Sequence, residues 1–226
     1  MAIKRIRALT VQNIYDKVYK LFEFIGDWFD AFGCPETTGV WFIWGNSGNG
    51  KTSFILQLIK CLAAFDCILL NSREEGSGYT LRKSFEAFNM RDVSRKLQIV
   101  NENIDQLTER LKLKKSPRIV IIDSFQYMQM SYKEYINFKE LFPNKLLIFI
   151  SHADGKNPAG RSAKSVMYDA SLKIWVEGYV AYSKGRYIGT TGKYVIWAEK
   201  AELYGKKEKI KYHHTWELNN YPNRKK

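Results

Sequence analysis

One stretch of the chain has the composition and spacing of a phosphate-binding loop. It fits the pattern GxxxxGK[ST] at every fixed position, after an apolar run and before a helical one. Glycines let successive backbone N–H groups turn inward toward phosphate oxygens, and the N-terminus of the following helix adds its dipole. Lys51 would bring a mobile positive charge to the β- and γ-phosphates, and the Thr52 hydroxyl would complete a Mg²⁺ shell. The predicted nucleoside triphosphate site consists of Gly45, Asn46, Ser47, Gly48, Asn49, Gly50, Lys51, Thr52 and Ser53.

The apolar run 118–123 ends in a carboxylate, Asp123. A carboxylate at the end of such a strand can hold the hydration shell of Mg²⁺. A buried strand followed by an aspartate turn is common, so the pattern takes its meaning from the phosphate loop upstream. We therefore expect this strand to lie beside the strand at 40–44, and Thr52 and Asp123 to be the metal-binding residues.

Two more apolar runs end in side chains that could act on a bound triphosphate. The run 67–71 is followed by Glu74 and Glu75, either of which could activate the attacking water, and the run 145–150 is followed by Ser151 and His152. Ligands of open α/β sheets bind at the carboxyl edge of the strands, where these side chains would lie. We expect both glutamates, the loop lysine and the histidine to form the catalytic set, the histidine as a sensor of the γ-phosphate. The alternatives are a solvated loop for the glutamates and a structural role for the histidine.

The elements that position these residues alternate along the chain. Strands that are apolar throughout, separated by helical patterns, predict a parallel sheet covered by helices on both faces. The expected strands are 40–44, 67–71, 97–100, 118–123 and 145–151, and the expected helices are 51–64, 79–89, 102–114 and 131–142. Beyond residue 170 an antiparallel extension is expected, with strands at 172–177, 179–188, 194–199 and 210–218. The fold class is therefore α/β, with a mostly parallel central sheet covered by helices and an antiparallel C-terminal extension.

The N-terminal region has a helical pattern of its own. Apolar residues between 11 and 29 recur with the i, i+3, i+4, i+7 spacing of an amphipathic helix, and Thr10 stands at the N-cap position. Packing against the domain is the expected role of the apolar face, and binding of another subunit is the alternative. The chain has no internal repeat, low-complexity tract or linker. We expect one domain, with a helical segment at 1–38 packed on a core at 39–226.

The 226-residue chain is strongly basic. It has 36 Lys and Arg against 23 Asp and Glu, a net charge of +13, of which +7 lies in residues 184–226. A basic surface concentrates polyanions, so nucleic acid is the expected partner and a merely solvated basic surface is the alternative. The three cysteines form no CxxC pair and cannot all be disulfide-bonded, which favours a reducing compartment. The histidines lack the spacing of zinc ligands, so no zinc site is expected. Without a signal peptide or an apolar run of membrane-span length, we expect a cytoplasmic protein with no membrane partner.

Two basic segments are candidates for binding a phosphate backbone. The segment 152–169 contains Lys156, Arg161 and Lys164 among glycines and a proline, which predicts a long basic loop beside the nucleotide sensor. An ordinary surface loop is the alternative. The lysines at 206, 207, 209 and 211 form the second candidate.

With these motifs together, the chain resembles the RecA-like ATPases, and within them the branch of RadA/Sms, KaiC and the DnaB helicases. The segment 71–75, Asn-Ser-Arg-Glu-Glu, is similar to the Ser-Gly-Glu-Glu segment that carries the catalytic glutamate of that branch, which favours Glu74 over Glu75. Residues 123–126, Asp-Ser-Phe-Gln, resemble the Asp-Ser-Ile-Gln of RadA/Sms, and residues 151–156 resemble its sensor strand and the start of a DNA-binding loop. The resemblance covers residues 39–205.

The chain also departs from that pattern. We find no counterpart of the zinc module or the protease-like domain of RadA/Sms in the printed sequence, and expect none. The Lys-Asn-Arg-Phe-Gly motif of RadA/Sms has only a distorted counterpart in residues 200–205, which puts in doubt a role for Lys200 at a neighbouring subunit's ATP. Small RecA-like cores of this size are similar to the Sak-type recombinases of phages, so the resemblance implies a phage or mobile-element origin.

The resemblance implies a Mg²⁺-dependent ATPase that assembles as a ring or filament on DNA, taken to be single-stranded, in recombination, repair or replication. It implies ATP and Mg²⁺ as cofactors, a homo-oligomer, and a replication or recombination protein as a further partner. Two other readings remain open. One is an ATP-gated helicase loader or clamp with slow hydrolysis, and the other is a P-loop kinase that acts on a small molecule.

Overall fold

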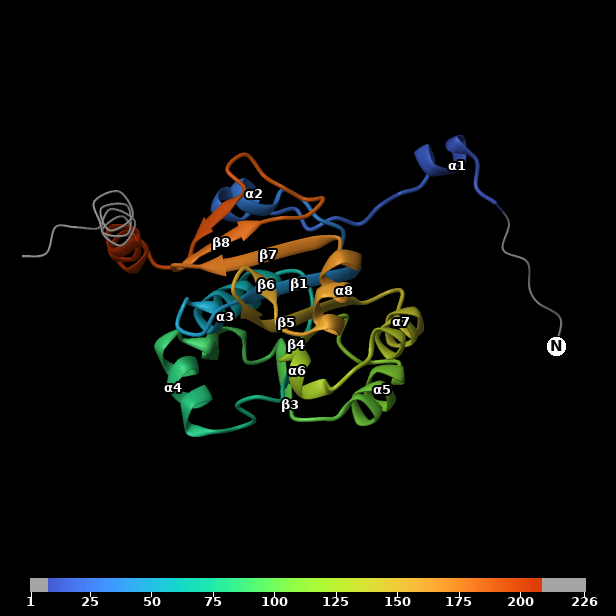
Figure 1. The fold of residues 1–226 in the computed structure, drawn as a ribbon. Helices are drawn as coiled ribbons and strands as arrows, with labels where there is room; N and C mark the ends of the chain where they lie inside the picture. Colours follow the sequence, from blue (N-terminus) through green and yellow to red (C-terminus); the bar gives the residue numbers. More distant parts are fainter. Residues whose placement is uncertain (1–7, 209–226) are drawn as a thin grey trace, which may run out of the picture.

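A computed structural model of the chain describes residues 8–208 (Figure 1). The expected strand at 210–218 and two of the basic residues near it, Lys209 and Lys211, lie outside the described residues. Within them, no helix has the length and apolar character needed to cross a membrane.

A single sheet runs through the middle of the molecule. Its order is β3-β2-β4-β5-β1-β7-β8-β9, with β6 paired to β5. The six strands from β3 to β7 in this order are parallel to one another. β8 pairs antiparallel with β7, and β9 pairs antiparallel with β8. The bounds are β1 Gly39–Gly45, β2 Ile68–Ser72, β3 Leu97–Val100, β4 Ile119–Asp123, β5 Leu146–Asp154, β6 Asn157–Pro158, β7 Leu172–Glu177, β8 Val180–Ser183 and β9 Lys193–Val195. The expected mostly parallel sheet with an antiparallel extension is confirmed.

The expected adjacency of the strands that carry the phosphate loop and Asp123 is wrong. β5 lies between β4 and β1 and pairs with both. Residues 146–151 of β5 are buried throughout, as in an interior strand of a parallel sheet that is covered on both faces. β4 therefore takes β2 as its other neighbour, and Ser72 lies opposite Asp123.

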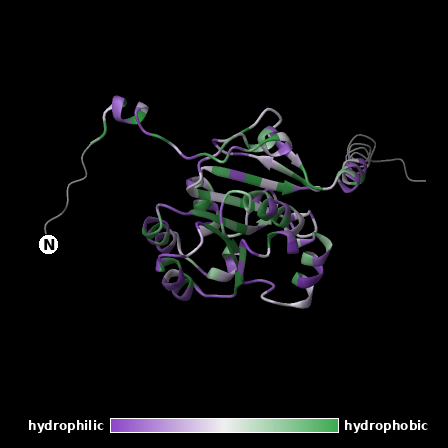
Figure 2. Cartoon of the chain, turned by 180° about the vertical axis from the view of Figure 1, so that it is seen from behind, coloured by the Kyte–Doolittle hydropathy of each residue, from purple (hydrophilic) through white to green (hydrophobic). Residues whose placement is uncertain are grey.

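Helices cover both faces of the sheet, and alternate residues of each strand face opposite helical layers. In β1, Trp41 and Ile43 pack into one core with α2 and α3, while Phe42 and Trp44 pack into the other with α5, α6, α7 and α8. Figure 2 shows the central strands as the most hydrophobic part of the fold. The bounds are α2 Gly26–Phe32, α3 Lys51–Leu62, α4 Tyr79–Ala87, η1 Met90–Val93, α5 Ile104–Lys112, α6 Phe125–Met128, α7 Tyr132–Leu141 and α8 Arg161–Asp169.

The N-terminal region contains two short helices instead of the one expected at 11–29. α1 (Val11–Tyr15) has the predicted cap at Thr10 but no buried residue, and it lies away from the rest of the fold in Figure 1. The segment between α1 and α2 is largely extended. There, Phe22 and Phe24 are buried while their neighbours Leu21 and Ile25 are exposed. This alternation of period two outweighs the helical spacing, because it places two aromatic rings in the core.

The C-terminal region also differs from the expectation. Two strands are expected at 179–188 and 194–199, but the observed strands are shorter, at 180–183 and 193–195, and residues 198–208 are helical. Lys200 therefore lies on a helix. Its ammonium sits over the rings of Trp197 and Tyr179, at 3.7 and 5.1 Å from their centroids.

Candidate nucleotide site

The phosphate-loop sequence connects the end of β1 to the start of α3, which is the context that the motif requires. Gly48 and Gly50 have φ values of +76° and +96°, which side chains disfavour, so the loop uses the freedom of its glycines. The ammonium of Lys51 donates to the carbonyl oxygens of Gly45 and Asn46, at 2.7 and 3.2 Å. Burial lowers the pKa of Lys51, while Glu74 and Asp123 act in the opposite direction. The lysine is thus held over the loop, within the field of two acids.

The turn between β7 and β8 holds the loop from the other side. The backbone N–H of Gly178 donates to the side-chain oxygen of Asn49 at 2.8 Å, and that of Tyr179 donates to the backbone oxygen of Asn49 at 3.1 Å. A Cβ at Gly50 would lie 2.9 Å from the Tyr179 ring. A Cβ at Gly45 would lie 2.2 Å from the Val176 carbonyl oxygen. The sequence motif did not reveal this contact, because it depends on the pairing of β1 with β7.

The carboxylates expected at the sheet edge come together there. The carbonyl oxygen of Asp123 accepts from the backbone N–H groups of Arg73 and Glu74, at 2.6 and 3.2 Å, which fixes the loop after β2 against the end of β4. Burial raises the pKa of Asp123 to about 7, with Glu74 and Glu75 adding to the effect and Lys51 opposing it. A carboxyl group in this setting binds a proton or a cation more readily than an exposed one does.

Glu74 and His152 meet across the site. The carboxylate of Glu74 lies 3.3 Å from Nε2 of His152, and both side chains are about one-third exposed. The hydroxyl of Ser124 is 3.5 Å from the same ring nitrogen. Glu75 differs from Glu74, because its Oε2 atom is buried and has no hydrogen-bond partner among the residues described. The two adjacent glutamates therefore have different surroundings, and Glu74 is the one that reaches His152.

Gln126 fixes the sensor strand. Its amide nitrogen donates to the Ser151 hydroxyl at 2.7 Å and to the Ala159 carbonyl at 3.0 Å, and its amide oxygen accepts from the backbone N–H of His152 at 3.3 Å. Sequence reasoning quoted this glutamine only as part of a motif and gave it no role. The only signal for it was its position three residues after Asp123.

The basic segment at 152–169 is not the long loop that the sequence suggested. β5 continues to Asp154 and turns back through β6, and α8 begins at Arg161. The apolar side chains of Ala163, Val166 and Met167 give α8 a buried face, which explains why the segment orders into a helix. Lys156 is exposed on the hairpin turn, and Arg161 and Lys164 are exposed on the first turn of α8. The hairpin is tied to the phosphate loop, since the Asn46 amide donates to the Gly155 carbonyl at 3.1 Å.

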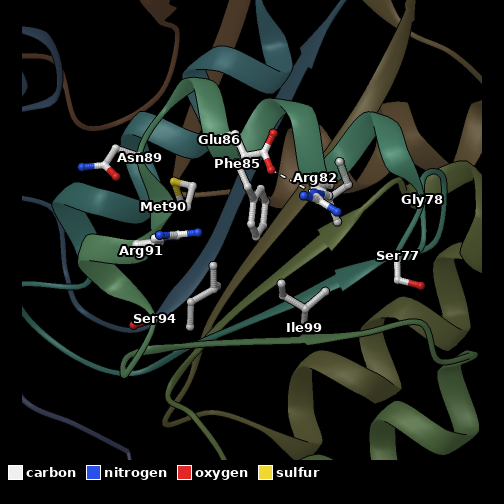
Figure 3. Close-up of a pocket in the computed structure, with 12 residues that line it drawn as sticks. Ser77, Gly78, Arg82, Phe85, Glu86, Asn89, Met90, Arg91, Ser94 and Ile99 are labelled. Carbon is white, nitrogen blue, oxygen red and sulfur yellow. Dashed lines mark hydrogen bonds and ion pairs between the residues drawn. The ribbon is translucent and has the colours of Figure 1, made fainter.

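A separate cleft lies between α4, η1 and β3 (Figure 3). Its volume is about 810 Å³, and its apolar wall is formed by Leu81, Phe85, Met90, Leu97 and Ile99. Its charged residues include the Arg82–Glu86 ion pair, whose atoms are 2.9 Å apart. None of the expected catalytic, nucleotide-binding or metal-binding residues lines it.

The residues around the loop suit a nucleotide-bound Mg²⁺ ion better than a protein-enclosed metal. The described residues contain no group of three or more His, Cys, Asp or Glu side chains that could hold a metal ion. Mg²⁺ in nucleotide sites needs only one or two protein ligands, because phosphates and waters supply the rest. The hydroxyl of Thr52 and the buried carboxyl of Asp123 match that requirement.

Comparison with known proteins supports the fold. No protein-family model and no curated protein sequence matches the chain. The solved structure of flagellar accessory protein FlaH from Methanocaldococcus jannaschii is similar, with a TM-score of 0.57, 14% identity, and coverage of 78% of this chain and 92% of that one. KaiC-like protein PH0186 from Pyrococcus horikoshii OT3 has a TM-score of 0.50 and 19% identity, with coverage of 71% and 90%. The chain has a RecA-like α/β fold with a P-loop at the end of its first strand.

Proposed function

We propose that the protein is a Mg²⁺-dependent ATPase that acts on single-stranded DNA in recombination, repair or replication and works as a homo-oligomer. The observation that carries the proposal is the meeting of Lys51, Glu74, Asp123 and His152 at one edge of a RecA-like sheet. Hydrolysis of a triphosphate needs a cation for the phosphates, a metal carboxylate and a base for water. Lys51, Asp123 and Glu74 supply them, and His152 contacts Glu74.

Each residue has a separate task in this scheme. The loop amides and Lys51 bind the phosphates, and Thr52 and Asp123 hold the Mg²⁺ ion, which when bound neutralises charge on the phosphate oxygens. Glu74 accepts a proton from the water that attacks the γ-phosphorus, and the contact with His152 holds its carboxylate in place. His152 lies within β5, two residues before the strand ends at Asp154, so a change at the γ-phosphate reaches the β5–β6 hairpin through a short path.

The nucleic-acid part of the proposal rests on charge and position. Lys156, Arg161 and Lys164 are exposed on the hairpin and on the first turn of α8, and the chain carries a net charge of +13. Lysine and arginine side chains that neutralise phosphates supply most of the affinity of non-specific binding to nucleic acids. The bond from Asn46 to Gly155 joins this basic surface to the phosphate loop.

The test is steady-state ATP hydrolysis by the full chain with single-stranded DNA, duplex DNA or RNA. We expect single-stranded DNA to stimulate turnover several-fold over the other two. Lys51→Ala should lower turnover by at least about a hundredfold, because electrostatic stabilisation of the transferred phosphoryl group is lost. Lys83→Ala, which removes an exposed lysine from α4, is the matched control and should leave turnover unchanged.

Equal turnover by wild type and Lys51→Ala would contradict the assignment of the nucleotide site. Hydrolysis that is indifferent to all three polymers would contradict the nucleic-acid part alone.

A further inference from the structure

A second hollow lies beside the β5–β6 hairpin, on the α8 side of the sheet. Its volume is about 490 Å³, and it is bounded by the end of β1, the hairpin turn, the last turn of α8 and the strands β7 and β8. The side chains that line it are unusual for a surface, since aromatic rings and lysines predominate. The aromatic residues are Trp44, Tyr168, Trp175 and Tyr182, and the lysines are Lys156, Lys173 and Lys184.

We propose that this aromatic–lysine groove binds a single-stranded polynucleotide, with bases against its rings and phosphates at its lysines. The proposal rests on the proposed function and deepens it, because it names the surface and the form of nucleic acid that the surface takes. Only one of the groove residues, Lys156, belongs to the basic set considered above.

The aromatic residues form a floor and two walls. The rings of Trp44 and Trp175 lie 5.6 Å apart and are only about 5% and 6% exposed, so they make a firm base. Tyr168 on α8 is 65% exposed, and Tyr182 lies directly across from Trp175 in the β7–β8 ladder and is half-buried. Rings fixed on a helix and a strand offer π-faces at low entropic cost, and each stacked base contributes measurably to binding single strands.

The charges around the groove suit a polyanion. The groove is lined by three lysines and by one acid, Glu177. The carboxylate of Glu177 already accepts a hydrogen bond from the indole N–H of Trp175, at 3.2 Å. Lys156 and Lys184 are exposed, and Lys173 is half-buried on β7. Lysines that track a phosphate backbone next to stacking rings are the general arrangement for binding single strands without sequence preference.

The combination of aromatic rings and lysines in the groove favours a single strand over a duplex. The bases of a duplex are stacked on one another, so their faces cannot reach tyrosine rings at the wall of a hollow. The volume of the groove also falls in the range of pockets that take small ligands, which suits an unstacked nucleotide. DNA and RNA share this chemistry, and the experiment distinguishes them.

The test is fluorescence anisotropy of labelled oligo-dT and oligo-U with the full-length protein, with and without a non-hydrolysable ATP analogue. We expect Tyr168→Ala to weaken binding about tenfold, as loss of a stacked base does. Lys184→Glu should weaken binding as well and make its dependence on salt less steep. A stronger effect on oligo-dT than on oligo-U identifies DNA as the partner of the groove, and the reverse identifies RNA.

The matched controls lie on α4, outside the groove. Tyr79→Ala removes a tyrosine that is 68% exposed, close to the 65% of Tyr168, and Lys83→Glu makes the same charge change as Lys184→Glu. Thermal melting of each variant confirms that it is folded.

Three outcomes would overturn the inference. If wild type binds and both groove variants bind as tightly, the groove is not the site, although the proposed function stands. If the α4 variants lose as much affinity as the groove variants, the effect is not local to the groove. If wild type binds neither polymer, the nucleic-acid part of the proposed function fails together with the inference.

Discussion

The candidate nucleotide site and the aromatic–lysine groove begin at adjacent residues of β1 and are built in opposite ways. Gly45 opens a site made of backbone amides, glycines and half-buried acids at strand ends, where a Cβ in the wrong place meets another atom within 3 Å. Trp44 opens a groove made of large rings and long lysines. The difference matches two kinds of task. Chemistry at a phosphate requires positions fixed to a fraction of an ångström, whereas binding a polymer of varied sequence requires surfaces that tolerate each base.

The two regions are joined by the β5–β6 hairpin. On the nucleotide side, the Asn46 amide donates to the Gly155 carbonyl, and on the groove side, the Trp44 indole donates to the Lys156 carbonyl, both at 3.1 Å. Two residues on either side of Gly45, at the end of β1, thus hold two neighbouring residues of the hairpin. A ligand that favours one position of the hairpin at either site must affect the other site equally, because coupling free energies are reciprocal.

Glu74→Gln should give the largest difference between the effect on hydrolysis at the nucleotide site and the effect on binding at the groove. This change removes the proposed base while keeping the shape of the side chain, so kcat should fall by about 10²- to 10⁴-fold. Affinity for ATP and affinity for oligo-dT should change little, because neither the loop lysine nor the groove is touched. Single-turnover hydrolysis and nucleotide binding measure the two effects separately.

Glu75→Gln is the matched control for that prediction, since it makes the same change one residue away. Its effect on kcat should be much smaller, because Glu74 and not Glu75 contacts His152. A larger loss with Glu75→Gln would reverse the roles of the two glutamates.

A second contrast concerns stability, because the nucleotide site keeps a buried carboxyl group at Asp123. Its pKa is raised to about 7 in the folded protein, above the ordinary value of 3.8, so the folded state binds a proton more tightly than the unfolded state does. The free energy of unfolding should therefore fall as pH rises through the window from about 4 to about 7. Asp123→Asn removes this titration and should stabilise the nucleotide-free protein at pH 8 by an amount on the order of a few kcal/mol, while abolishing hydrolysis.

Chemical unfolding of the metal-free protein at pH 5 and pH 8 measures this effect. The gap between Asp123→Asn and wild type should shrink at the lower pH. Asp154→Asn, at an exposed position on the end of β5, is the control and should show no such gap. An Asp123→Asn protein that is less stable than wild type at pH 8 would contradict the argument from burial.

The sequence predicts the nucleotide site better than the groove. The phosphate loop is a local pattern, and the carboxyl ends of parallel strands meet at one edge whatever their order. Asp123, Glu74 and His152 could therefore be placed together although the strand order was wrong, with β5 between β4 and β1. Their roles stay predictions.

The groove could not be foreseen in the same way, because its residues come from distant parts of the chain. Trp44 and Trp175 become neighbours only when β1 pairs with β7, and Tyr168 reaches them only because α8 is a helix and not a loop. The prediction of one helix at 11–29 was wrong for a related reason. The apolar spacing there fits both a helical and an extended period, and the burial of Phe22 and Phe24 in the core favours the extended one.

The smallest predicted effect tests whether the β5–β6 hairpin couples the nucleotide site to the groove. Trp44→Phe keeps an aromatic ring in the floor of the groove but removes the indole N–H that donates to the Lys156 carbonyl. A single hydrogen bond of this kind contributes about 0.5–1.5 kcal/mol, so the factor by which ATP and oligo-dT strengthen one another's binding should fall about two- to tenfold. Binding of each ligand alone should change less, because neither the phosphate loop nor the lysines are altered. Asn46→Ala removes the matching bond on the nucleotide side and should reduce the same factor. A factor that both variants leave unchanged would mean that the two regions act independently, and that the hairpin joins them in structure only.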